Sequence, residues 1–95
     1  MNNKTLLCFD YGEKRIGVAV GQTITSTATA LETIIVRNKK PDWDAIGKLI
    51  SEWKPDKFVV GHPFTLDGAR QKMTELAEKF SRQLQHRYNT PVDLV

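Results

Sequence analysis

The sequence predicts an α/β domain in which a mixed sheet of five strands carries two packed helices. Five short apolar or β-branched segments are predicted strands, at 6–9, 15–21, 31–36, 57–61 and 92–95. Two amphipathic stretches separate the last three of these segments. Three antiparallel strands therefore come first, and right-handed crossovers add two parallel strands, which gives the predicted spatial order 3-2-1-4-5. With 95 residues, the chain is expected to form a single domain, 1–95.

The first two strands are predicted to form an antiparallel hairpin. Leu6–Phe9 is an apolar run, and Tyr11–Lys14 contains the glycine expected of a tight turn. Arg15–Gly21 then alternates large apolar residues on one face with glycine and alanine on the other. A face that small lets a helix or a neighbouring backbone approach closely. The polar segment Gln22–Thr29 is expected to be a loop, and Leu31–Val36 the third strand.

The two helices are predicted from caps, breakers and apolar spacing. Asp42 is placed to begin the first helix as its N-cap or a first-turn acid, and Pro55 ends it. Its apolar face, shared by the Trp43/Trp53 pair, is expected to belong to the core. The loop Gly61–Gly68 follows the fourth strand, and Asp67 is the expected cap of the second helix. The apolar positions of that helix are Met73, Leu76, Ala77, Phe80 and Leu84.

Composition narrows the class of protein without naming a function. Hydrophobic residues make up 40% of the chain and charged residues 26%, as in ordinary globular proteins. A net charge of +3 permits a polyanionic partner. The basic residues near the first hairpin form either a phosphate-contacting surface or a solvated face: Lys14, Arg15, Arg37, Lys39 and Lys40. The single cysteine, Cys8, and the lack of a signal peptide or membrane span predict a cytosolic protein.

Asp10 is the residue most able to carry chemistry. It ends an apolar strand and shares a strand face with Leu6 and Cys8. One interpretation is structural, with the carboxylate bonded to amides of the turn at Gly12. The other is a divalent metal site, because carboxylates at a sheet edge can hold Mg²⁺ or Mn²⁺ against a phosphate. Asp56 and Asp67 are poor second ligands, since the first lies at the wrong strand end and the second caps a helix.

The segments that surround Asp10 resemble the YqgF/RuvX family of small bacterial proteins with a ribonuclease H-like fold. The resemblance spans essentially all 95 residues and rests on Asp10–Gly12, Lys14–Ala19, Asp42–Trp43, Pro55–Asp56, Val59–Gly61, Pro63, Asp67–Gly68 and Pro91–Val92. It implies a metal-dependent nuclease, with maturation of the 5′ end of 16S ribosomal RNA as the expected role. In this resemblance Asp10 matches the first metal-binding carboxylate, and Lys14 and Arg15 are expected to contact nucleic acid. The implied cofactor is Mg²⁺ or Mn²⁺.

The resemblance also implies carboxylates that this chain does not contain. Family members continue past the strand matching 91–95 into an Asp-Glu-Arg motif and a helix with a further Asp. The 95 residues alone are therefore expected to be nearly inactive, and the apolar surface left uncovered favours a homodimer. Three alternatives stay open: a Holliday-junction resolvase-like DNA nuclease, an actin-like ATPase, and a catalytically silent nucleic-acid-binding module. His62 and Thr65 depart from the family pattern, and His62 is expected to be a loop residue without a catalytic task.

Overall fold

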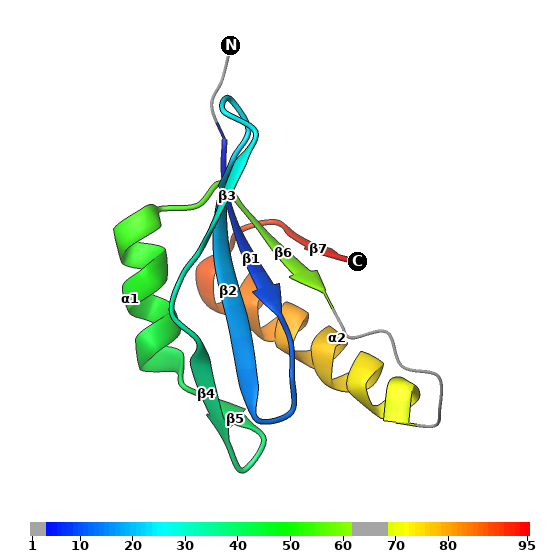
Figure 1. Cartoon of the computed structure of the whole chain (residues 1–95). Coiled ribbons are helices and arrows are strands. Elements are labelled where there is room, and N and C mark those ends of the chain that lie inside the picture. Colours follow the sequence, from blue (N-terminus) through cyan, green and yellow to red (C-terminus); the bar gives the residue numbers. More distant parts are fainter. Residues whose placement is uncertain (1–3, 62–68) are drawn as a thin grey trace.

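The computed structural model describes residues 4–61 and 69–95, and it shows a curved mixed sheet with two helices (Figure 1). The elements follow in the order β1 (Thr5–Asp10), β2 (Arg15–Gln22), β3 (Thr27–Ala30), β4 (Ile34–Arg37), β5 (Lys40–Pro41), α1 (Trp43–Trp53), β6 (Lys57–Gly61), α2 (Ala69–Tyr88) and β7 (Val92–Leu94). The predicted loop 61–68 lies outside the described residues except for Gly61, and so do His62, Thr65 and the predicted cap Asp67.

The sheet has the predicted strand order. Its strands run β5-β4-β2-β1-β6-β7, with β3 also paired to β2. The five predicted strands correspond to β1, β2, β4, β6 and β7, so the order 3-2-1-4-5 is confirmed. β1 is antiparallel to β2 and parallel to β6, and β6 is parallel to β7. The mixed α/β fold class is therefore confirmed, with two short strands more than expected.

The two additional strands correct the expectation for the segment between β2 and α1. Residues 27–29 were expected to belong to a loop, but Thr27–Ala30 pairs with the second half of β2 as β3. The strand expected at 31–36 begins later, at Ile34, where β4 pairs with the first half of β2. β5 adds two residues across a tight turn whose residues Asn38 and Lys39 have φ of 51° and 62°. Two positive φ values in a two-residue loop are the pattern of a type I′ turn.

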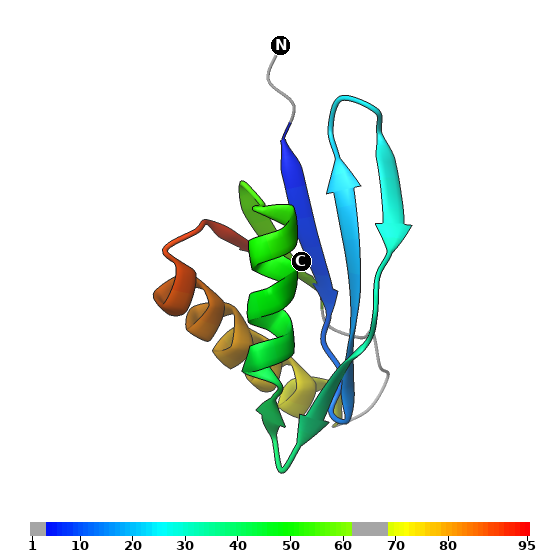
Figure 2. The same cartoon turned by 90° about the vertical axis from the view of Figure 1, so that its left-hand side faces the viewer.

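Both helices lie on the same side of the sheet (Figure 2). The residues that β1, β2, β4 and β6 turn toward the helices form the core with α1 and α2: Leu7, Phe9, Ile16, Val18, Val20, Ile34, Val36, Phe58 and Val60, with Ile46, Leu49, Ala77, Phe80 and Leu84. Trp43 and Trp53 pack against this core, which confirms their predicted place. Phe80 is 1% exposed and is surrounded by the rings of Phe9, Tyr11 and Trp43 at centroid distances of 5.4, 5.3 and 5.5 Å.

The ends of α1 follow from local chemistry. The Asp42 side chain accepts a hydrogen bond from the Ala45 N–H at 3.2 Å, which confirms the predicted N-cap. Lys54 adopts a left-handed conformation with φ of 45°, and its N–H bonds to the Ile50 carbonyl before Pro55. Neither helix, over the part of the chain that is described, is long and apolar enough to cross a membrane.

On the opposite side of the sheet, the described residues form no helix. Strand alternation places Leu6, Cys8 and Asp10 of β1 there, since Leu7 and Phe9 point to the core. In β2 the same side carries Arg15, Gly17 and Ala19. We call this side the open face, and it is where the candidate site lies.

Candidate functional site

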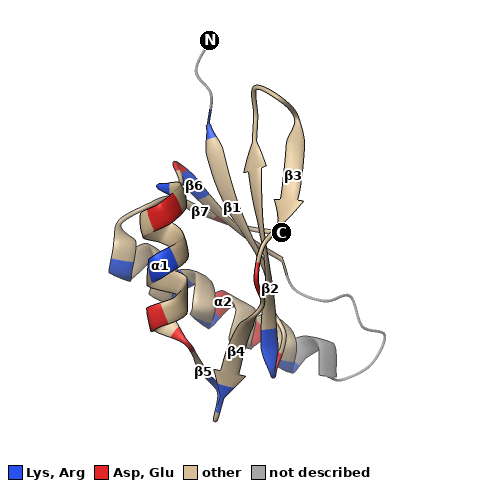
Figure 3. Cartoon of the chain, turned by 60° about the vertical axis from the view of Figure 1, so that its left-hand side comes forward, with Lys and Arg blue, Asp and Glu red and all other residues tan. Residues whose placement is uncertain are grey.

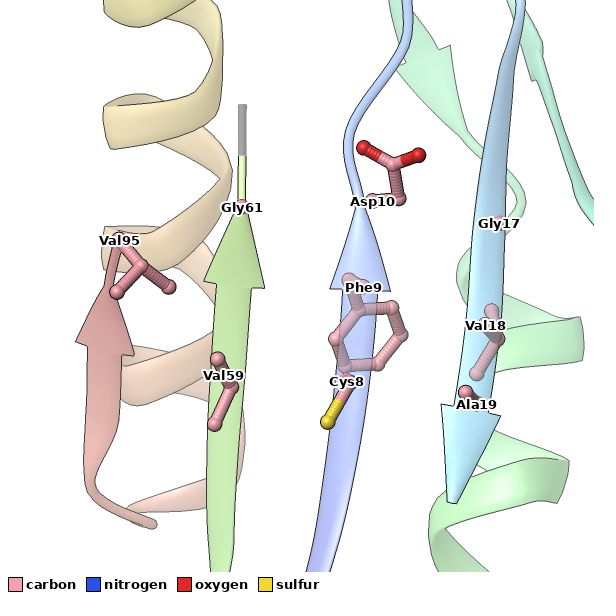
Figure 4. Close-up of a pocket in the computed structure, with 9 residues that line it drawn as sticks. All are labelled: Cys8, Phe9, Asp10, Gly17, Val18, Ala19, Val59, Gly61 and Val95. Carbon is pink, nitrogen blue, oxygen red and sulfur yellow. The ribbon is translucent and has the colours of Figure 1, made fainter. Parts of the chain in front are cut away.

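Asp10 lies on the open face, where β1 ends, with a glycine beside it on each neighbouring strand. The register pairs Asp10 with Gly17 of β2 and with Gly61 of β6. Figure 4 shows the carboxylate at the tip of β1 between these two glycines. A methyl group added at Gly61 would meet none of the described residues within 4 Å, and one at Gly17 would make only ordinary contact with Asp10. Within residues 4–61 and 69–95, the two strands beside the carboxylate thus place no side chain next to it.

The carboxylate is exposed, as predicted for a functional residue. Among the described residues, no hydrogen bond or ion pair engages it, so the interpretation that turn amides satisfy it is not what the structure shows. A charged group held at a strand end without a protein partner remains available to a ligand.

Two buried neighbours hold Asp10 in place. Phe9 and Tyr11 are 1% and 3% exposed and pack on the helix side of the sheet. The Tyr11 N–H donates to the Gly61 carbonyl at 3.0 Å, which continues the pairing of β1 with β6 past Asp10. Burial, followed by the nearby Glu13 carboxylate, raises the pKa of the Tyr11 hydroxyl. The Asp10 backbone is therefore fixed by packing before and after it.

The turn after Tyr11 requires glycine. A methyl group at Gly12 would lie 2.5 Å from the Arg15 carbonyl oxygen, which is a clash with backbone. This close approach lets the chain return at once into β2. The hairpin is joined to β4 by a hydrogen bond from the Val36 N–H to the Lys14 carbonyl at 2.9 Å.

Lys14 and Arg15 are both exposed in and after this turn. Arg15 lies two residues before Gly17 on β2, so strand alternation puts it on the open face with Asp10. The structure thus brings Arg15 to the same face as Asp10, while Lys14 lies in the turn itself. Neither cation has an ion-pair partner among the described residues.

A shallow hollow of about 370 Å³ extends from Asp10 over the open face. Its walls include Cys8, Ala19, Val59 and Val95 and are mostly apolar (Figure 4). The Cys8 thiol is free, and burial raises its pKa. Cys8 lies half-buried on the open face and is not part of the core.

The donor set for a metal ion is incomplete within the described residues. Asp10 offers the oxygen ligand that Mg²⁺ and Mn²⁺ prefer. However, 4–61 and 69–95 contain no group of three or more histidine, cysteine or acidic residues placed to hold a metal. Asp56 instead accepts from the Thr5 N–H at 2.8 Å, at the other end of β1, and Asp93 forms an ion pair with Lys57. Asp10 thus fits as one ligand, and further ligands would have to come from outside the described residues.

For Gly61, the sequence predicted only that it begins the loop after the fourth strand. That loop was expected to share a rim with Asp10, and the register shows Gly61 directly beside the carboxylate. Gly17 was noted only as a small residue in β2. The signal that could have found both is the register, because the pairing of β1 with its two neighbours decides which residues flank Asp10.

Comparison with known proteins identifies the family. Residues 4–95 match the profile of RuvX, described as Holliday junction resolvase. The chain belongs to the RuvX family. The resemblance seen in the sequence is thereby confirmed.

Several curated relatives are about half identical to this family member over the aligned residues. A protein from Paraburkholderia phytofirmans is 55% identical over 91 residues, covering 96% of this chain and 62% of its own length. Relatives from Pseudomonas putida and Pectobacterium atrosepticum are 54% and 48% identical, with 94% and 99% of this chain and 63% and 68% of their own lengths covered. All three are named "Putative pre-16S rRNA nuclease". The chain thus spans a little under two thirds of the first two relatives.

Solved structures agree on the fold. The structure titled T. thermophilus RuvC in complex with Holliday junction substrate has a TM-score of 0.63 at 15% identity, covering 97% of this chain and 64% of that one. An Aquifex aeolicus PPX-GPPA enzyme has a TM-score of 0.52 at 12% identity, with 99% and 36% covered. At such low identities these likenesses concern the fold alone. The RuvC likeness bears out the predicted ribonuclease H-like fold.

Proposed function

We propose that this RuvX-family chain is the part of a nuclease that carries the first metal-binding carboxylate, and that the nuclease matures the 5′ end of pre-16S ribosomal RNA. The observation that carries the proposal is Asp10, which is exposed at the end of β1 with a glycine on each side and which no described residue engages in a hydrogen bond or ion pair. The names of relatives that are about half identical support the substrate. The reaction is hydrolysis of a phosphodiester bond.

The residues of the chain have separate tasks in this proposal. Asp10 would hold a divalent cation, Mg²⁺ or Mn²⁺, which when bound stabilises charge on the reacting phosphate oxygens. Gly17 and Gly61 leave room for a phosphodiester next to the carboxylate. Arg15, on the same face, and Lys14 contact flanking phosphates and set the direction of the strand.

The test is the change Asp10→Asn, which keeps the size of the side chain and removes its charge. In a chain extended to include the family's remaining carboxylates, and with Mg²⁺ or Mn²⁺ present, we expect cleavage of a labelled ribosomal-RNA precursor to fall on the order of a hundredfold or more, several kcal/mol in the barrier. Asp44→Asn is the matched control, because Asp44 is equally exposed but lies on α1, on the other side of the sheet. Equal cleavage by the Asp10→Asn protein and the unmutated protein, with and without metal, would remove Asp10 from the mechanism.

A DNA nuclease that acts on branched junctions is the second candidate. The family description and the fold shared with RuvC favour it. The same two variants, assayed on a branched DNA and on the RNA precursor, separate the two substrates. Binding of both without cleavage of either would favour the silent binding module that the sequence left open.

The 95 residues by themselves present one candidate metal-binding carboxylate among those described. A site with two metal ions about 3.5–4 Å apart needs several carboxylates. We therefore expect these 95 residues to cleave far more slowly than a full-length relative, such as the one from Pseudomonas putida. Comparable rates for the two proteins would show that Asp10 suffices.

Partners and location follow from the same proposal. A ribosomal-RNA precursor is a cytosolic molecule, so the proposal places the protein in the cytosol. The open face is partly apolar, and Val95 at its edge is 72% exposed. Burial of such a surface favours a homodimer, and sedimentation that shows only monomer at high protein concentration would argue against it.

A further inference from the structure

The β4–β5 hairpin carries cations on the open face, in line with Asp10. Alternation along β4 buries Ile34 and Val36 and leaves Ile35 and Arg37 on the opposite side. Ile35 pairs with Arg15 in the register, so both side chains belong to the open face. Lys40 faces Arg37 across the hairpin and is exposed as well. Figure 3 shows the resulting basic segments at the ends of β2 and of the hairpin.

These cations lie at increasing distance from Asp10 along one diagonal of the sheet. The path crosses from β1 to β2 and from β2 to β4, two steps of about 4.8 Å. It also runs four residues along the strands, about 13 Å at 3.3 Å per residue. The straight-line separation of the Asp10 and Arg37 Cα atoms across the sheet is therefore about 16 Å. Phosphates of one strand in a duplex follow each other every ~3.4 Å along the axis, so the path covers about five of them.

The β4–β5 hairpin leaves the side chains of Arg37 and Lys40 exposed to solvent. Its two-residue turn, with positive φ at Asn38 and Lys39, is rigid and short. Ile35, Arg37, Lys40 and Asp42 line a hollow of about 380 Å³. The one acid among them, Asp42, already accepts the Ala45 N–H as the cap of α1. No ion pair in the described parts of the chain engages Arg37 or Lys40.

We propose that Arg37 and Lys40 of the β4–β5 hairpin bind phosphates of the nucleic acid several nucleotides away from Asp10. The inference rests on the proposed function only in taking a nucleic acid as the partner. The shared chemistry is a phosphodiester backbone, which RNA and DNA both provide. The hairpin binds it through charge, and the role is positioning: these residues fix how the strand crosses the open face.

The experiment measures binding without cleavage. The variant Arg37→Gln/Lys40→Gln is titrated with a labelled RNA stem-loop and with a DNA duplex of the same length, in chelator, from about 50 to 200 mM salt. Two lost phosphate contacts should lower the salt slope by about 1.4 to 1.8 and weaken binding roughly tenfold at the lowest salt. Thermal melting checks that the exposed substitutions leave the fold intact.

The matched control is Lys79→Gln/Arg82→Gln. It removes one lysine and one arginine from exposed positions of α2, which lies behind the sheet from Asp10. We expect its salt slope to stay within about 0.5 of the unmutated chain. An equal loss in both variants would show that net charge alone matters, and a larger loss in the control would place the binding surface on the helices. Either result, or no binding by the unmutated chain, overturns the inference.

The binding titrations and the cleavage assay together keep this inference apart from the proposed function. Binding that depends on the hairpin, together with no cleavage by the extended chain under any metal condition, would support the phosphate contacts and refute the nuclease. Cleavage that depends on Asp10, with a salt slope that the hairpin variant leaves unchanged, would support the nuclease and refute the phosphate contacts. The RNA and DNA arms show which backbone the hairpin prefers.

Discussion

Replacing Phe80 by alanine should cost more stability than any other single truncation near the site. The side chain is 1% exposed, and three aromatic rings surround it at 5.3 to 5.5 Å. Loss of a buried phenylalanine costs about 3–5 kcal/mol, and the edge-on and stacked ring contacts place this one in the upper half of that range, at about 4 kcal/mol. A domain of this size is stable by roughly 5–14 kcal/mol, so the change removes a large share of the total.

The assay is urea unfolding followed by fluorescence. With an m value of about 1–1.5 kcal/mol/M, the midpoint should fall by about 3 M, or the folded state should be lost. Phe80→Leu is the measurable companion if the alanine variant does not fold, and it should cost about 1–1.5 kcal/mol because most of the volume remains. A cost below about 1.5 kcal/mol for Phe80→Ala would refute the reasoning that these rings form one packed unit behind Asp10.

Two further predictions concern the residues around the carboxylate. Gly12→Ala should lower the free energy of unfolding by about 1–3 kcal/mol, because its methyl group meets the Arg15 carbonyl at 2.5 Å, whereas Gly61→Ala should change stability by less than about 1 kcal/mol; similar denaturation midpoints for the two variants would contradict this. The folded state raises the pKa of Cys8 and Tyr11 above their ordinary values of 9.0 and 10.0. Their contribution to stability is therefore complete below pH 9 and declines as the pH rises through the folded pKa values. Tyr11→Phe should flatten that decline above pH 10 in pH-dependent urea titrations, and an unchanged curve would show that Tyr11 is not involved.

The sequence could predict those strands and helices whose apolar residues recur at the spacing of a buried face. The alternation in β2 and the apolar run of β6 determine which sides face the helices, and Asp42 marks the start of α1 because its side chain caps the helix. β3 could not be predicted in the same way. All four of its residues are exposed, so its sequence shows no alternation of buried and exposed residues. It is a strand because its backbone pairs with the free edge of β2.

The candidate site likewise contains a residue that the sequence could predict and neighbours that it could not. Asp10 could be singled out because it is the charged residue that ends the otherwise apolar run of β1. That Gly61 would lie beside it, and Arg37 on the same face, depends on strand pairing between segments far apart in the chain. Residue types and spacing carry little information about such pairing.

β1 is attached at both of its ends, and this restricts how the strand could slip. At one end the Asp56 carboxylate bonds to the Thr5 N–H, and at the other the Tyr11 N–H bonds to the Gly61 carbonyl. A slip of one residue would turn Asp10 into the apolar core and bring two aromatic rings out into water. A slip of two would keep its face but move the carboxylate about 6.6 Å from its glycine neighbours. The strand can thus hold Asp10 at only one working position, and any error in pairing is costly enough to be rejected during folding.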